Sequence, residues 1–206
     1  TTAAALTLLP AASMLGCKGM ASLTNTNSEK EPVSTAGGLI LNVMDFGAKA
    51  DGITKDSQAI QQAIDRCSVL GGGEVLFPKG NYFTGAIALK SKVLLRLEKE
   101  AVIMGSPDFA DYPVSQVRWE GKWIKGHVGL IYGFNVQDSG IAGPGKIAGN
   151  HALGGRPNAQ YPLRHPALIE PVNCSNLRFE DFSTDYYLMW SIHPTCCQHL
   201  LFKNLY

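Results

Sequence analysis

The hydrophobic pattern begins with a short β-rich run at residues 39–43 and then becomes helical. Between Asp56 and Val69 the apolar residues fall on one face at helical spacing, at Ile60, Ala63, Ile64 and Cys67. Thr54 or Asp56 can cap the N-terminus of this helix, and Gly71-Gly72-Gly73 end it. Short runs rich in β-branched and aromatic residues follow at 74–77, 82–89 and 93–102. The pattern predicts an all-β chain with one amphipathic helix.

The end of the chain contains an internal repeat. Residues 174–182 align with residues 197–205 at a spacing of 23, with Cys174 over Cys197 and Phe179 over Phe202. A looser earlier copy matches Leu130-Ile131 to Leu168-Ile169 and Gly140-Ile141 to Asn176-Leu177, at two different spacings. We therefore expect an insertion at residues 152–166.

A period in the low twenties with short strands is typical of one coil of a solenoid. The Leu-x-x-Leu-x-Leu signature of leucine-rich repeats is absent from the sequence. The predicted fold is a single-stranded parallel β-helix. The amphipathic helix would lie across its first end, where strand edges and core are otherwise open.

The repeat places Cys174 and Cys197 in neighbouring coils, whose strands stack about 4.8 Å apart. We expect buried, reduced thiols rather than a disulfide, because a free Cys packs well as a small hydrophobe. The spacing of Cys67, Cys174, Cys196 and Cys197 fits no zinc pattern. We predict no metal site and no cofactor.

The first 38 residues have a different composition. Because the chain opens on Thr rather than Met, residues 1–17 are interpreted as a truncated export signal with a short apolar run. Leu15-Gly16-Cys17 resembles a bacterial lipoprotein cleavage box, which would make Cys17 the lipid-bearing residue; the alternative is an ordinary cleaved secretory signal. Residues 18–38 are polar and predict a flexible tether. Both readings predict export to the periplasm, the outer membrane or the exterior, with membrane attachment only through the lipid.

Charge changes the picture little. The formal net charge is +1, and 17% of the residues are charged, without a basic stripe. Nucleic acid is therefore not an expected partner. We expect a monomer, with one β-helix domain over residues 39–206.

Two stretches of motif carry a family resemblance. Residues 45–64 with 71–82 resemble the entry segment of pectin-acting β-helix proteins, in which Asp45, Asp51 and Asp56 have structural roles. Between about residues 41 and 206, the order and spacing of further motifs resemble the polygalacturonases of glycoside hydrolase family 28; these are Arg118-Trp119-Glu120-Gly121, residues 130–133, residues 141–149, Arg164-His165-Pro166 and residues 187–194. The chain departs from the family where His165 separates Arg164 from Pro166 and where Ala148 replaces an Asp.

The resemblance implies inverting hydrolysis of galacturonosyl linkages in polygalacturonate or rhamnogalacturonan. Such a reaction needs an acid and a base about 6.5–9.5 Å apart. The family carries its carboxylates in Asn-x-Asp and Asp-Asp motifs, followed by Gly-His-Gly and Arg-x-Lys, and none of these occurs here. We expect them beyond Tyr206, so that this chain is an inactive N-terminal part. Glu180, Asp181 and Asp185 are weak alternatives within it.

Candidate substrate-binding residues remain in three places. Arg118, Trp119 and Glu120 are expected in a long loop that forms a sugar-binding rim or merely packs on the coils. Arg164 would meet a substrate carboxylate or pair with Glu170. Trp190 and His193 lead toward the expected active coil, although His193 before Pro194 also fits a turn.

Two other functions use the same scaffold. A Ca²⁺-dependent lyase would need clustered carboxylates, and a surface or adhesion protein would need no converging acids. Whichever function applies, the last coil at residues 200–206 would expose strand edges and apolar side chains. We therefore expect the isolated chain to aggregate.

Overall fold

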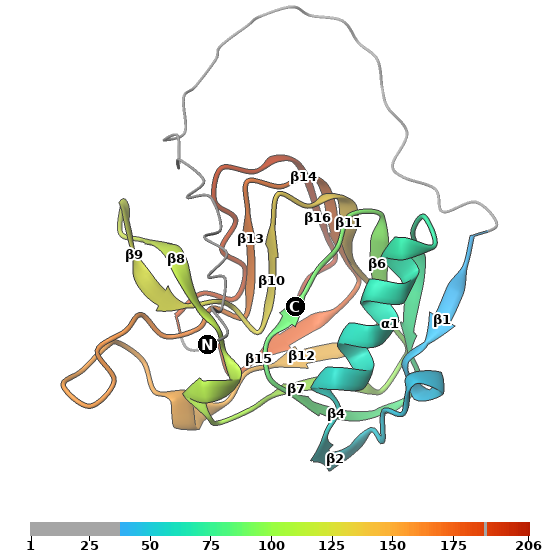
Figure 1. The fold of residues 1–206 in the computed structure, drawn as a ribbon, viewed down its shortest axis with the longest axis horizontal. Coiled ribbons are helices and arrows are strands. Elements are labelled where there is room, and N and C mark those ends of the chain that lie inside the picture. Colours follow the sequence, from blue (N-terminus) through green and yellow to red (C-terminus); the bar gives the residue numbers. More distant parts are fainter. Residues whose placement is uncertain (1–37, 188) are drawn as a thin grey trace, which may run out of the picture. The chain divides into compact units, whose positions relative to one another are not determined.

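Successive coils of the chain contribute strands to three parallel sheets, which lie on different sides of the coil in the computed structural model (Figure 1). The structure describes residues 38–187 and 189–206. One sheet has six strands in the order β1 (Ile40–Asn42), β3 (Gly73–Phe77), β6 (Val93–Leu97), β11 (Gln137–Ala142), β14 (Ser175–Glu180) and β16 (Gln198–Lys203). The predicted parallel β-helix is confirmed.

The other two sheets close the coil around a shared apolar core. One has three strands, in the order β13 (Ile169–Val172), β10 (Ile131–Phe134) and β5 (Ile87–Ala88). The other has five, in the order β15 (Ser183–Asp185), β12 (Lys146–Ala148), β7 (Ala101–Gly105), β4 (Gly80–Thr84) and β2 (Asp51–Lys55). A separate antiparallel hairpin joins β8 (Val114–Trp119) to β9 (Lys122–His127).

The 23-residue repeat sets the register between the last coils. Leu177 pairs with Leu200 and Phe179 with Phe202 along β14 and β16. The two phenylalanine rings stack with centroids 5.4 Å apart. Each coil therefore places equivalent side chains directly over one another, as the sequence predicts.

The predicted alignment of the looser, earlier copy of the repeat is partly wrong. Ile131 does pair with Ile169, but Gly140 pairs with Arg178 rather than Asn176, so that both halves share one spacing. Gly140 is a site of close approach, because a Cβ there would lie 2.0 Å from the backbone oxygen of Arg178. The extra length of this coil lies at 149–168, between β12 and β13, and includes a 3-10 turn, η3 (His151–Leu153).

The extended runs expected at 82–89 and 93–102 each divide into two strands. The first becomes β4 and β5, and the second becomes β6 and β7, which belong to different sheets. A corner separates the members of each pair, and Glu100 takes a positive φ of 66° at one of them. Apolar alternation continues through a corner, so that the pattern alone hides the break.

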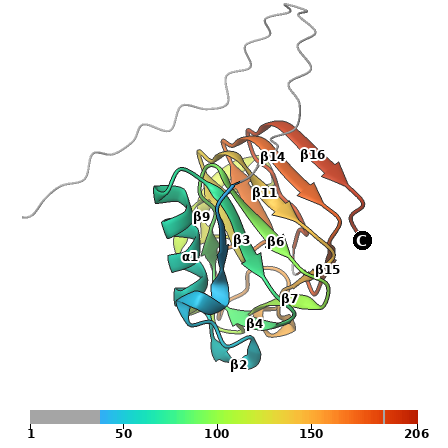
Figure 2. The same ribbon diagram turned by 90° about the vertical axis from the view of Figure 1, so that its right-hand side faces the viewer.

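Helix α1 (Ser57–Val69) lies at the β1–β3 end of the stack (Figure 2). Its buried face carries the residues that the periodicity selected, together with Ala59. Asp56 occupies the N-cap position but its carboxylate makes no cap hydrogen bond. It accepts instead from the backbone N–H groups of Lys49 (2.7 Å) and Ala50 (3.0 Å), so that it fixes the preceding turn. The 3-10 turn η1 (Val43–Phe46) lies earlier in the segment that leads to this helix.

The opposite end is formed by the last strand. Leu201, Phe202 and Tyr206 are 39%, 46% and 83% exposed, which agrees with the apolar edge expected there. No helix in the described residues is long and apolar enough to cross a membrane. The predicted signal, Cys17 and nearly all of the tether lie outside the described residues.

The cysteine ladder has the predicted stacking, and Cys67, Cys174 and Cys197 are free thiols. Val136 donates its N–H to the Cys174 sulfur, and Cys174 donates its N–H to the Cys197 sulfur, both at 3.4 Å. The side-chain hydrogen bond between the two thiols lowers the pKa of Cys197 to about 7 and raises the pKa of Cys174. Burial raises the pKa of Cys67.

Alkylation with iodoacetamide should therefore select Cys197. Because a thiolate is the nucleophile, the rate of alkylation of Cys197 should rise with a midpoint near pH 7. Cys67 and Cys174 should react only at higher pH. Replacing Cys174→Ala removes the donor and should move the midpoint upward, whereas Cys67→Ala should not. Peptide mapping by mass spectrometry measures each site. An unchanged midpoint in the Cys174→Ala protein would show that the ladder does not set the thiolate.

Candidate functional site

The outer surface of the three-stranded sheet gathers polar and aromatic side chains in one column. Tyr132 on β10 pairs in register with Glu170 on β13. A parallel bridge between Ile169 and Ile192 then places His193 beside Glu170 in the next coil. Alternation along a strand turns the isoleucines inward and these residues outward. The column is thus fixed by the same stacking that builds the core.

Arg164 supplies the charge that balances this column. Its Nη1 donates to Glu170 Oε2 at 2.9 Å, and its Nη2 forms an ion pair with Glu170 Oε1 at 2.7 Å. Nη1 also donates to the backbone oxygen of His127 at 3.1 Å. The side chains of Arg164 and Glu170 are 0% and 1% exposed. The structure therefore favours the ion-pair alternative for Arg164 over direct contact with a ligand.

Trp190 and His193 cover the ion pair from outside. Their rings stack with centroids 4.3 Å apart at 12°, and the Arg164 guanidinium lies 5.3 Å from the Trp190 ring centroid. His193 Nδ1 is 3.2 Å from Glu170 Oε1 and 3.3 Å from Arg164 Nη2. That nitrogen can donate to Glu170 or accept from Arg164, depending on its tautomer. We call Arg164, Glu170, Trp190 and His193 the Arg164 cluster.

The Arg164 cluster has an electrostatic core with little exposed surface and an aromatic outer layer. Trp190 is half-buried and the His193 side chain is 18% exposed. A flat, partly exposed pair of rings presents an apolar face with polar edges. Such a surface can stack against a sugar ring, and the sequence suggests a substrate-binding role for both residues.

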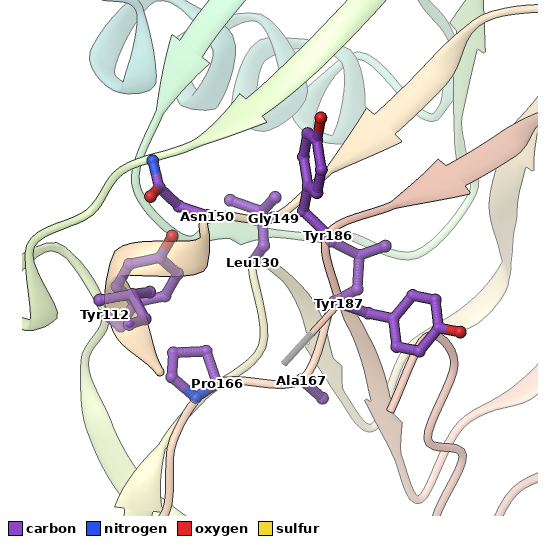
Figure 3. A pocket seen from close by; sticks show the side chains of 10 residues that line it. Tyr112, Leu130, Gly149, Asn150, Pro166, Ala167, Tyr186 and Tyr187 are labelled. Carbon is purple, nitrogen blue, oxygen red and sulfur yellow. The ribbon is translucent and has the colours of Figure 1, made fainter. Parts of the chain in front are cut away.

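Two further aromatic residues precede Trp190 in the chain. Tyr186 and Tyr187 are 47% and 57% exposed, and their rings point in different directions around a cavity of about 10 Å³ (Figure 3). A space of that size admits at most a water molecule. The Tyr186 ring packs against His151, with centroids 4.2 Å apart and the rings tilted by 59°, and Tyr186 borders a wider groove of about 660 Å³ over the five-stranded sheet. Sequence reasoning included Tyr187 in the motif at residues 187–194 but assigned neither tyrosine a role.

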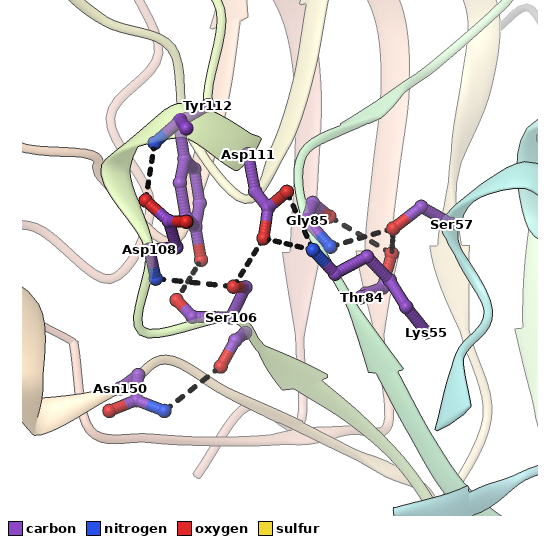
Figure 4. Close-up of polar contacts among 11 residues, drawn as sticks. Lys55, Ser57, Thr84, Gly85, Ser106, Asp108, Asp111, Tyr112 and Asn150 are labelled. Atoms are coloured by element: carbon purple, nitrogen blue, oxygen red, sulfur yellow. Dashed lines mark hydrogen bonds and ion pairs between the residues drawn. The ribbon is translucent and has the colours of Figure 1, made fainter. Parts of the chain in front are cut away.

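The turn before the hairpin is fixed by a polar network (Figure 4). Lys55 and Ser106 donate to the Asp111 carboxylate. Burial alone would raise the pKa of Asp111, but hydrogen bonds from Lys55 and Ser106 hold the pKa below its usual range. Tyr112 donates to the Ser106 backbone oxygen at 2.9 Å. The network includes η2 (Phe109–Asp111) and anchors the start of β8.

The rim residues lie in the β8–β9 hairpin, so the predicted long loop is wrong. Arg118 pairs opposite Trp123, and its guanidinium lies 5.6 Å from that ring centroid. Trp119 projects to the other face, with its indole N–H buried without a partner. Glu120 sits in the turn and pairs with Arg156 at 3.6 Å. The structure does not gather the three residues on one face.

The acids within the chain have other partners. Glu180 lies 3.7 Å from Arg178, and Asp185 lies 3.8 Å from Lys146. Asp181 accepts a hydrogen bond from the Asn204 amide at 2.7 Å. No group of three or more His, Cys, Asp or Glu side chains suited to a metal occurs in residues 38–187 and 189–206.

Comparisons with known proteins agree with the fold. A family model described as rhamnogalacturonase A/epimerase, pectate lyase-like, matches residues 40–117. A protein named probable polygalacturonase from Vitis vinifera is 27% identical over 175 residues, 80% of this chain and 36% of that protein. Exo-poly-alpha-D-galacturonosidase from Dickeya chrysanthemi is 39% identical over 103 residues, 46% of this chain and 17% of that protein. The chain therefore spans about a third of the first relative and about a sixth of the second.

Solved structures extend the likeness through most of the described fold. The exopolygalacturonase of Thermotoga maritima has 25% identity and a TM-score of 0.73, over 81% of this chain and 46% of that chain. Relatives over shorter stretches include plasmin and fibronectin-binding protein A of Streptococcus pneumoniae (45% over 75 residues) and alginate lyase 7 of Azotobacter vinelandii (47% over 62 residues). The chain is a parallel β-helix that is similar to polygalacturonases and, over shorter stretches, to a lyase and a surface-binding protein.

Proposed function

We propose that this domain belongs to a glycoside hydrolase that cleaves galacturonosyl linkages of pectic polysaccharide with inversion. The observation that carries the proposal is the likeness to two exo-acting galacturonan enzymes, one of which matches the fold over 81% of the chain. Polygalacturonate is the substrate class that those names share. The proposal concerns the protein that carries this domain.

The Arg164 cluster supports a role in substrate binding. Its neutral, buried ion pair supplies no net charge to the surface, and leaves recognition to the stacked rings of Trp190 and His193. Rings held rigidly lose little freedom when a sugar binds. Arg164 and Glu170 are therefore positioning residues, and Trp190 with His193 are the candidates for contact.

The catalytic acids are proposed to come from coils that follow Tyr206 in the natural protein. An inverting reaction needs one carboxylic acid at the leaving oxygen and one carboxylate that activates water on the opposite face. Glu180, Asp181 and Asp185 already have partners at the surface of the coils. This arrangement supports a binding role for the described coils.

Export is also a proposal. A pectic polymer is too large to act on inside a cell, so that an exported enzyme with a lipid at Cys17, or a cleaved secretory signal, suits the substrate. Labelling with a radioactive fatty acid, with Cys17→Ala as the control, distinguishes the two.

The protein at its natural length should release reducing ends from polygalacturonate. Proton NMR should show that the product first appears with the anomeric configuration opposite to that of the linkage. An unsaturated product would identify a lyase. Binding to host plasmin or fibronectin without turnover of any polysaccharide would identify a surface protein like the Streptococcus pneumoniae relative.

In the active protein, Trp190→Ala should raise KM for polygalacturonate roughly three- to tenfold, because one stacking contact contributes about 0.5–1.5 kcal/mol. Trp190→Phe should retain most of the affinity. Steady-state kinetics measures both variants. Equal KM values in the wild-type and Ala proteins would remove Trp190 from the binding surface.

Breaking the buried pair should destabilise the domain. Glu170→Ala leaves the Arg164 guanidinium buried without its partner, and should lower the free energy of unfolding by about 3–5 kcal/mol. The double variant Arg164→Met, Glu170→Met should recover much of that loss. Lys90→Ala, which removes an exposed pair with Asp65, should cost less than about 1 kcal/mol. Urea denaturation compares them, and similar losses in Glu170→Ala and Lys90→Ala would contradict the proposed burial.

A further inference from the structure

The β8–β9 hairpin is an ordered element outside the stacked sheets (Figure 1). Its strands pair antiparallel without a break, and the turn residues Glu120 and Gly121 both have positive φ, 45° and 85°. Such a two-residue turn matches the twist of the strands. An isolated two-stranded hairpin is marginal in water. This one is anchored to the domain through its inner face and, at its base, through His127, whose ring centroid lies 5.0 Å from that of Phe109.

The inner face of the hairpin packs on the domain. Val117 is fully buried, and a Cβ at Gly126 would lie 2.6 Å from the Val117 side chain and 2.7 Å from that of Arg164. Trp119 and Lys122 are paired on this same face, nearer the turn. The inner face thus adjoins the backbone from which the Arg164 cluster extends.

The outer face is cationic and aromatic. It carries the cross-strand pairs Arg118–Trp123 and Gln116–Lys125, which lie roughly 7 Å apart along the strands. Neither strand contains an acid, and Glu120 in the turn pairs with Arg156. Within the described residues, Arg118 and Lys125 take part in no ion pair, whereas Arg96, Arg164 and Arg178 each face a carboxylate.

Arg118 has no carboxylate and is held instead over Trp123, with Lys125 exposed beside it. A guanidinium held near an indole by a cation–π contact keeps N–H donors free, and a planar carboxylate can accept two of them. The indole next to it offers an apolar surface to a pyranose ring. The guanidinium therefore suits the carboxylate of an acidic sugar, and the indole suits its ring.

We propose that the outer face of this hairpin is a subsite for a uronate residue of the polysaccharide, with Trp123 stacking on the ring and Arg118 and Lys125 binding its carboxylate. The choice of a uronate over other anions rests on the proposed function. The inference that the ligand is an anion with a sugar ring rests on the side chains of the hairpin itself. Trp123 and Lys125 are thereby assigned to recognition, and Trp119 to packing.

The test measures, by calorimetry, the affinity of the protein at its natural length for oligogalacturonate of defined length. Arg118→Gln and Lys125→Gln should each weaken binding roughly three- to tenfold, allowing for solvent exposure of both side chains. Trp123→Ala should do the same, and Trp123→Phe should restore most of the affinity. Lys122→Gln removes the same charge from the inner-face row and should change affinity less than about twofold.

Equal losses in Arg118→Gln, Lys125→Gln and Lys122→Gln would show only diffuse attraction and would overturn the subsite. So would undiminished binding in Arg118→Gln and Trp123→Ala. Fully methyl-esterified oligomers should bind the wild-type protein and Arg118→Gln equally, and a persisting difference would also count against it.

Failure of the proposed function has a different signature. A protein that does not hydrolyse polygalacturonate, yet binds oligogalacturonate or oligomannuronate with the same dependence on Arg118 and Trp123, retains the subsite and loses the hydrolase assignment. A protein that hydrolyses polygalacturonate with unchanged KM in Arg118→Gln and Trp123→Ala retains the hydrolase assignment and loses the subsite.

Discussion

In-register stacking of parallel strands is the constraint on which the rest of this domain depends. Each coil leaves backbone groups unpaired until the next coil covers them, and the pairing fixes which side chains meet. Leu177 over Leu200 and Phe179 over Phe202 share one register. The same register aligns the sulfurs of Cys174 and Cys197 and the polar pair of Asp181 with Asn204. A repeat in sequence thus becomes a column in space.

The columns differ by the side of the strand on which they lie. Inward columns are apolar because they form the only core that a coil has. Outward columns are free to vary, and the one that runs from Tyr132 through Glu170 to His193 becomes polar and aromatic. Placing a buried Arg164 beneath that column costs desolvation energy, which the bidentate pair with Glu170 offsets. The stacking therefore gives recognition residues a rigid base.

Sequence reasoning located the features that repeat or are periodic. The helix face, the 23-residue register, the thiol ladder and the alternative partner of Arg164 all follow from spacing and composition. It failed where the local backbone conformation depends on segments that are distant in the sequence. The corner near Glu100 and the close approach at Gly140 carry no local hydrophobic signal. The contact of Trp123 with Arg118 needed the strand pairing, although the Glu-Gly dipeptide of a tight hairpin turn was there to be noticed.

The hairpin shows what the stacking constraint permits when it is relaxed. β8 and β9 form a separate two-stranded sheet, and β9 bridges to a third segment at Gly126 with Arg164. No equivalent residue in a neighbouring coil restricts the outer face at Arg118 and Trp123. The stacked sheets must alternate inward apolar and outward residues, whereas the hairpin is attached through Val117 on its inner face and through His127 at its base. Its outer face can therefore keep Arg118 and Lys125 without carboxylate partners, at the cost of mutual repulsion that a bound anion would remove. In a β-helix, unpaired charge of this kind is most readily tolerated on elements that the coils do not have to stack upon.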